Sequence, residues 1–258
     1  KALILCNPSN PCGKVFTMEE MQTIAELAKK YDAYVVTDEV YEHIVYAPNK
    51  HIYMQSLEGM RERTIVCNSL SKTYSITGWR LGYVIANQQI IDRVKKVHDF
   101  LTVGAAAPLM EAAVVGLEFG DGYYDELAAH YAHMKEVFVG GLKKLGLKYT
   151  DPQGAYYVLV DVSEFGVKDD VKFCEWMAQY VGVAAVPGSS FFREDVHNLV
   201  RFHFAKQDDT LNEAIKRLAT LKEKAMNAKN VNWRYHESGG FKTSSGHCSQ
   251  TCIRPAEV

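Results

Sequence analysis

Apolar runs that lead directly into polar loops constrain the fold of this 258-residue chain more than any other feature. Ala2–Cys6 is one such run, and Ala33–Thr37 is a second that ends at Asp38. Between them, Thr17 opens a capping box that predicts a helix to about Tyr31. Strands that alternate with helices in this way predict an α/β protein with a doubly wound, mostly parallel sheet.

The same pattern continues along the chain and then changes. We expect strands at about 64–68 and 82–86, and helices at about 88–103, 108–119 and 123–145. A turn at 151–154 opens a smaller α+β domain, with strands at about 156–161, 183–187 and 198–204 and helices at about 169–180 and 208–226. Residues 227–258 are rich in Ser, Gly, Asn and Thr, which is typical of a disordered tail. The expected division is therefore 1–145, 146–226 and 227–258.

Composition excludes several classes of protein. The chain is 47% hydrophobic with a net charge of −2 and no basic runs, which argues against nucleic-acid binding. No apolar stretch reaches the roughly 18 residues of a membrane span. The six scattered cysteines suit a reducing cytosol, and His247 with Cys248 and Cys252 provides too few ligands for a closed zinc site. We expect no metal and a cytoplasmic location.

Four polar residues follow the predicted strands. Asn10 and Asp38 come after the first two apolar runs, and Lys72 lies among small hydroxyl residues eight positions before Arg80. Parallel sheets bind ligands at the carboxyl ends of their strands, so these side chains are expected at one sheet edge. A lysine away from carboxylates suits a nucleophilic amine, and an arginine beside hydroxyls suits a phosphate. The pattern indicates a Schiff-base lysine beside a phosphate site.

These motifs, in their order, resemble the fold-type-I pyridoxal-phosphate aminotransferases of classes I and II. The resemblance runs from Lys1 to about Ala225, and its motifs are Asn10–Gly13, Thr37–Tyr41, Ser69–Lys72, Gly78–Gly82, Pro152–Tyr157 and Val200–Phe202. A softer resemblance to the kynurenine/glutamine aminotransferase branch rests on His51, Ser56–Met60 and Arg63–Thr64. Family members carry a further N-terminal part, so the chain is expected to be truncated there, with an incomplete large domain.

The resemblance implies a role for each residue near the cofactor ring. Lys72 would form the Schiff base with pyridoxal 5'-phosphate and later move the substrate's Cα proton. Asp38 would pair with the pyridine nitrogen and keep the ring an electron acceptor. Tyr41 and Asn10 would donate hydrogen bonds to the 3′ oxygen of the ring.

The resemblance also assigns the phosphate and substrate contacts. Arg80 and Ser69 would hold the phosphate, with Ser71 as a second candidate whose side chain could instead cap the local turn. Arg201, on the last predicted strand, would bind the α-carboxylate of the substrate. An arginine in a surface ion pair is the alternative for this position.

The resemblance implies amino-group transfer between an L-amino acid and a 2-oxo acid, and it implies a homodimer. Two alternatives stay open at this point. A pyridoxal-phosphate C–S β-lyase would share the same first steps, because reaction choice depends on loop contacts. A catalytically incomplete fragment could act only as a binding module. The sequence does not identify the amino acid or the oxo acid.

Overall fold

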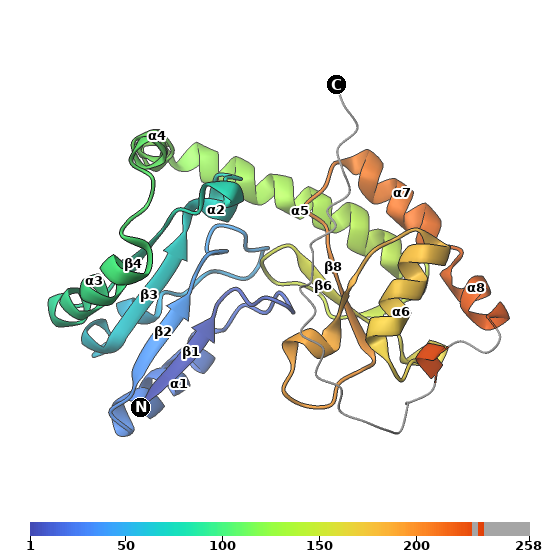
Figure 1. Ribbon diagram of the computed structural model, residues 1–258, viewed down its shortest axis with the longest axis horizontal. Coiled ribbons are helices and arrows are strands. Elements are labelled where there is room, and N and C mark those ends of the chain that lie inside the picture. Colours follow the sequence, from blue (N-terminus) through green and yellow to red (C-terminus); the bar gives the residue numbers. More distant parts are fainter. Residues whose placement is uncertain (229–231, 235–258) are drawn as a thin grey trace.

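The computed structural model describes residues 1–228 and 232–234, which form two sheets joined by a long helix (Figure 1). The first sheet has the order β1-β2-β3-β4. Its strands are β1 (Ala2–Cys6), β2 (Tyr34–Asp38), β3 (Thr64–Ser69) and β4 (Gly82–Ile85). The first three are parallel and β4 is antiparallel to β3. The predicted α/β class with a mostly parallel sheet is confirmed.

The helix α1 (Met18–Lys30) begins as the sequence predicts. The Thr17 side chain accepts from the Glu20 backbone N–H, and the Glu20 side chain accepts from the Thr17 N–H. This reciprocal pair satisfies two backbone donors that the first helical turn leaves free. The buried side of α1, including Met21 and Ala25, packs with Val35 of β2 in one apolar cluster. The helix therefore covers one face of the first sheet.

Three helices connect the two sheets along the chain: α3 (Gln88–Thr102), α4 (Ala107–Leu117) and α5 (Asp121–Lys144). The short helix α2 (Leu70–Thr73) lies between β3 and β4 of the first sheet. The long α5 reaches from the first sheet to the second (Figure 1). Sequence patterns predicted α3, α4 and α5 to within a few residues, but not the four-residue α2, which is too short to show a helical period.

The second sheet is antiparallel, with the order β5-β6-β8-β7. Its strands are β5 (Lys148–Tyr149), β6 (Tyr157–Asp161), β7 (Val186–Pro187) and β8 (Leu199–His203). The short β5 was not expected, and β7 is shorter than the strand expected at 183–187. The largest apolar cluster of the described residues surrounds this sheet and includes side chains from α5, β6 and β8.

The helices on the second sheet differ from the sequence expectation in two places. They are α6 (Asp170–Trp176), α7 (Asp208–Leu218) and α8 (Leu221–Asn227). The helix expected at 169–180 continues beyond α6 as a wider π turn, Met177–Val181. The helix expected at 208–226 is interrupted at 219–220, where the Thr220 hydroxyl donates to the Arg217 carbonyl. Such a side-chain bond competes with the helical backbone bonds.

Short 3₁₀ turns complete the described structure. They are Met54–Ser56, Arg61–Arg63, Thr77–Trp79, Ser163–Phe165, Gly188–Phe191 and Asn232–Arg234. The last one differs from the disordered tail expected from residue 227, because Trp233 is fully buried against Phe173 and Trp176. Asn227 itself ends α8. The rest of that tail, with His247, Cys248 and Cys252, lies outside the described residues.

Among the residues that the structure describes, no helix has the length and apolar character needed to cross a membrane. The division at residues 145 and 226 stays a prediction, although each sheet lies within one of the expected parts.

Candidate active site

Asp38 lies at the carboxyl end of β2, in the middle of the first sheet. The sheet register places Cys6 of β1 and Cys67 of β3 on either side of it. The Asp38 carboxylate accepts a hydrogen bond from the Val40 backbone N–H at 3.3 Å and remains exposed. Burial raises the pKa of the neighbouring Cys6 thiol to about 11, and the Asp38 charge adds to the rise. The thiol therefore stays protonated beside this carboxylate at neutral pH.

Hydroxyl groups gather where β3 ends. Ser69 Oγ lies 2.6 Å from Ser71 Oγ and accepts the Ser71 backbone N–H at 3.0 Å. The side chain that caps this turn is therefore that of Ser69, while Ser71 contributes its backbone N–H. The backbone of Arg80 has a φ of 57°, a left-handed conformation that residues other than glycine rarely adopt. Its guanidinium donates to the Thr77 carbonyl at 2.9 Å. A guanidinium has five N–H donors, so this bond leaves capacity for an anion.

Lys72 stands at one end of a row of tyrosine rings. Its Nζ lies 5.9 Å from the centre of the Tyr156 ring and donates to Thr77 Oγ1 at 3.4 Å. Tyr156 meets Tyr41 edge to face, with ring centres 5.3 Å apart. Tyr41 OH and Tyr157 OH are 2.8 Å apart. The row therefore connects the first sheet to the start of β6.

Arg201 stands at the other end of this row. Its guanidinium carbon lies 4.3 Å from the centre of the Tyr157 ring and 4.5 Å from that of Phe191. Its Nη1 donates to Asn10 Oδ1 at 2.6 Å, across 191 positions of sequence. This contact joins the loop after β1 to β8. Lys72, Tyr41, Asn10 and Arg201 thus belong to one continuous set of contacts.

Burial sets the electrostatics of this row. It raises the pKa of the Tyr41 phenol, and the neighbouring Tyr156 and Tyr157 raise it further. Tyr41 therefore keeps its proton and can donate a hydrogen bond. Burial also lowers the pKa of Arg201, although a guanidinium stays charged at neutral pH. A charged, partly desolvated guanidinium is a strong partner for a carboxylate.

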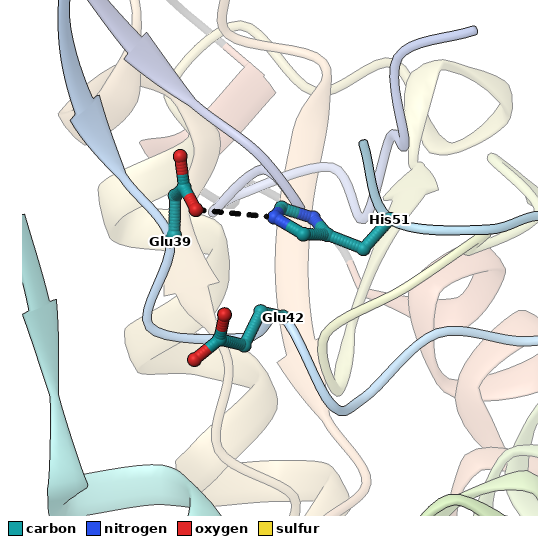
Figure 2. A group of neighbouring side chains, drawn as sticks. All are labelled: Glu39, Glu42 and His51. Atoms are coloured by element: carbon teal, nitrogen blue, oxygen red, sulfur yellow. Dashed lines mark hydrogen bonds and ion pairs between the residues drawn. The ribbon is translucent and has the colours of Figure 1, made fainter. Parts of the chain in front are cut away.

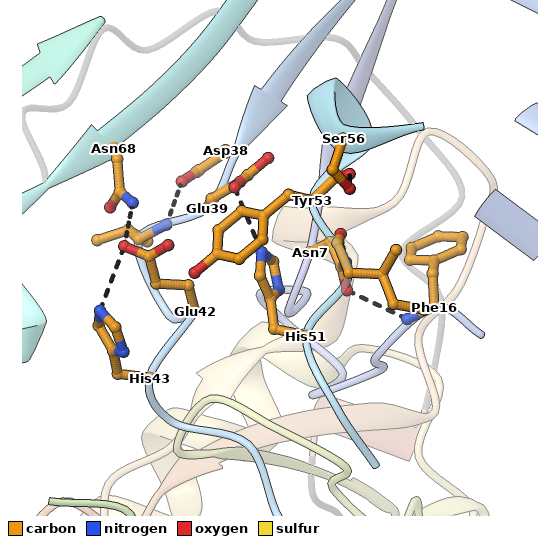
Figure 3. Close-up of polar contacts among 12 residues, drawn as sticks. Asn7, Phe16, Asp38, Glu39, Glu42, His43, His51, Tyr53, Ser56 and Asn68 are labelled. Atoms are coloured by element: carbon orange, nitrogen blue, oxygen red, sulfur yellow. Dashed lines mark hydrogen bonds and ion pairs between the residues drawn. The ribbon is translucent and has the colours of Figure 1, made fainter. Parts of the chain in front are cut away.

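A polar cluster lies next to Asp38, formed by the buried Glu39 and the partly buried Glu42 and His51 (Figure 2). Their ligand atoms lie within 4.8 Å of one another, a spacing that would allow a metal ion. Each carboxylate already has a hydrogen-bonding partner. Glu39 Oε2 is 3.3 Å from His51 Nε2, and Glu42 Oε1 accepts from Asn68 Nδ2 at 2.6 Å (Figure 3). We therefore interpret the cluster as support for the turn that follows β2.

The model of the family "Aminotransferase class I and II" matches residues 1–218. The chain belongs to this family. It is 36% identical over 234 residues to a probable N-succinyldiaminopimelate aminotransferase of Mycobacterium tuberculosis, covering 87% of this chain and 59% of the relative. It is 37% identical over 235 residues to kynurenine–oxoglutarate transaminase 3 of Bos taurus, covering 83% of this chain and 52% of the relative.

Solved structures agree with this family membership. The structure of N-succinyldiaminopimelate aminotransferase from Mycobacterium tuberculosis matches with a TM-score of 0.82 at 35% identity, covering 86% of this chain and 58% of that one. The chain thus spans about half to three fifths of the length of the curated relatives that it matches. The relatives' names include several amino acids, so they do not select one branch for this aminotransferase chain.

Sequence reasoning missed the roles of three aromatic residues in this site. Tyr156 and Tyr157 were noted only as part of a family motif, yet their rings link Lys72 to Arg201. Phe191 was not singled out, although its ring contacts the Arg201 guanidinium. A pair of tyrosines at the start of a strand is the available signal, but it also fits an ordinary apolar core.

Proposed function

We propose that the whole protein is a pyridoxal-phosphate-dependent aminotransferase that moves an amino group between an L-amino acid and a 2-oxo acid. One observation carries the proposal: an amine, Lys72, and a guanidinium, Arg201, stand at the two ends of one row of tyrosine rings. A covalent amine site beside a carboxylate site is the arrangement that amino-acid chemistry requires. Family membership supports the same reaction class.

The residues present fit pyridoxal phosphate. Asp38 offers a carboxylate to a ring nitrogen, and Arg80 with Ser69 offers a cation and a hydroxyl to a phosphate. Ser71 is a second phosphate candidate. When bound, the cofactor supplies an electron sink for the bond that breaks at the substrate Cα. Lys72 would hold the cofactor covalently and carry the Cα proton.

Asn10 and Tyr41 would connect the two halves of the site. Asn10 uses its Oδ1 for Arg201, which leaves its amide N–H groups for the 3′ oxygen of the cofactor ring. Tyr41 keeps its proton, so its hydroxyl can donate to the same oxygen. Arg201 would bind the substrate carboxylate through paired N–H donors and so orient the Cα proton toward Lys72.

The test compares cofactor binding and amino transfer in three forms of the whole protein. Wild type should acquire the visible absorption of covalently held pyridoxal phosphate and transfer amino groups to 2-oxo acids. Lys72→Ala should lose this band and about 10³-fold or more of the activity. Lys14→Ala is the matched control, because Lys14 lies in the loop after β1 and pairs with Glu20. Retention of the band in Lys72→Ala would contradict the assignment of Lys72.

The homodimer and the cytoplasmic location stay predictions. A panel of amino donors, assayed for amino transfer and for release of pyruvate with ammonia, separates the aminotransferase from a C–S β-lyase.

A further inference from the structure

The loop between β7 and β8, residues 188–198, brings an aromatic ring to Arg201. Phe191 lies in this loop, with its ring centre 4.5 Å from the Arg201 guanidinium carbon. The loop begins close against β8: a Cβ on Gly188 would lie 2.5 Å from the Leu199 carbonyl oxygen. Only glycine fits there, so the loop leaves β7 along a fixed path.

Asp170, the first residue of α6, holds this loop at two points. Its side chain is fully buried, and both carboxylate oxygens are used. Oδ2 accepts the Ser189 backbone N–H at 2.8 Å, and Oδ1 lies 3.0 Å from His197 Nδ1. Ser189 and His197 stand on either side of Phe191 in the loop. A buried carboxylate needs such partners, so loop and helix constrain each other.

The charge of His197 agrees with this geometry. Its hydrogen bond to Asp170 is the largest cause that raises the pKa of His197, and Asp195, 2.7 Å from Nε2, adds to the rise. A protonated imidazole donates from both nitrogens. It can therefore bond to Asp170 and Asp195 at the same time, which fixes the second half of the loop.

We propose that Asp170 is a positioning residue for the substrate carboxylate. Through Ser189 and His197 it holds the 188–198 loop so that Phe191 stays against the Arg201 guanidinium. The inference rests on the proposed function of Arg201. Contact with aromatic rings stabilises a guanidinium and limits its rotation, so less freedom is lost when a carboxylate binds. Loosening the loop should weaken substrate binding and leave the later chemistry nearly unchanged.

The experiment uses Asp170→Asn in the whole protein. The amide keeps the shape of the side chain but removes the charge and one acceptor. We expect the KM for amino acids to rise roughly 3- to 30-fold, the range that a lost cation–π contact permits, with kcat nearly constant. We also expect faster hydrogen exchange at the Ser189 amide, measured without cofactor. Amines that lack a carboxylate should keep their rates.

Asp169→Ala is the matched control. Asp169 precedes Asp170 and caps α6 by accepting the Lys172 N–H at 3.0 Å. Its loss removes the cap of the same helix without removing a bond to the loop. The KM and the Ser189 exchange rate should stay close to wild type. Equal changes in the two variants would show a general loss of stability and overturn the proposal.

Phe191→Leu tests the same link from its other end and does not depend on the folding of Asp170→Asn. It should raise the KM over the same range, and the double variant should rise no further than either single one. An unchanged KM in Phe191→Leu, or in a folded Asp170→Asn, overturns the proposal. A wild type without amino transfer would instead contradict the proposed function, while the Ser189 exchange rate would still report on the loop.

Discussion

The two sheets of this chain differ in how they hold the residues of the candidate site. In the second sheet, four of the five residues of β6 are buried, and Arg201 comes from the adjacent β8. In the first sheet, all four residues of β4 are exposed, and Ile4 of β1 is 77% exposed. Arg201 is thus placed by a packed core. Asp38 and Lys72 are placed mainly by strand pairing and by bonds within turns.

This difference shows that one site can draw on two kinds of support. Packing positions a side chain because voids and overlaps both cost free energy. Backbone pairing positions the ends of strands even where the side chains stay exposed. The tyrosine row lies at the junction, with Tyr156 stacked on Tyr131 of α5 at 5.6 Å between ring centres. Substitutions at the site, in the strands of the two sheets and in an exposed ion pair should therefore have effects of different size.

The largest effect should follow from removing Arg201. If it binds the α-carboxylate, Arg201→Ala should lower kcat/KM for every amino acid by about 30-fold to several thousand-fold, the consequence of losing roughly 2–5 kcal/mol. Amines without a carboxylate should be scarcely affected, and Arg201→Lys should restore little because an ammonium lacks the planar pair of donors. Steady-state rates with matched acid and amine substrates provide the measurement. Equal losses for both substrate types would make Arg201 a structural residue.

The contrast in packing can be tested with two leucines in strands. Leu159 of β6 is 3% exposed and Leu3 of β1 is 43% exposed. Leu159→Ala should lower the free energy of unfolding by about 2–5 kcal/mol, because it removes buried contacts and leaves a cavity. Leu3→Ala should cost under about 1 kcal/mol. Denaturant titration of both variants checks this. Similar losses of unfolding free energy would show that Leu3 is as buried in solution as Leu159.

The smallest effect concerns an exposed pair that joins α5 to α7. His133 Nε2 lies 2.8 Å from Asp208 Oδ2, and this hydrogen bond raises the pKa of His133 above 6.5. A histidine with a raised folded-state pKa contributes stability that is fully present below its unfolded pKa and is lost as pH rises through the folded pKa. His133→Gln should therefore lower the melting temperature slightly in mildly acidic buffer and not at all in alkaline buffer. A difference that persists at high pH would contradict this origin.

Local patterns in the sequence predicted much of the fold. The capping box at Thr17 marked the start of α1, and apolar runs marked β1, β2 and β3. These signals rest on contacts between residues a few positions apart, so they can be read along the chain. They did not predict α2, which is too short to show a helical period. They also did not predict the break between α7 and α8, where the Thr220 hydroxyl bonds to the Arg217 carbonyl.

The sequence by itself also determined which residues are chemical candidates. Lys72 among hydroxyls, Asp38 after a strand and Arg80 eight positions beyond Lys72 were evident from residue type and spacing. Only the tertiary structure decided how the halves of the site meet, through Asn10 with Arg201 and through Tyr41 with Tyr157. These pairs are separated by more than a hundred positions, and their contact depends on the packing of the whole chain. Short-range patterns carry no information on such contacts, because the free energy that brings the two segments together comes from the core between them.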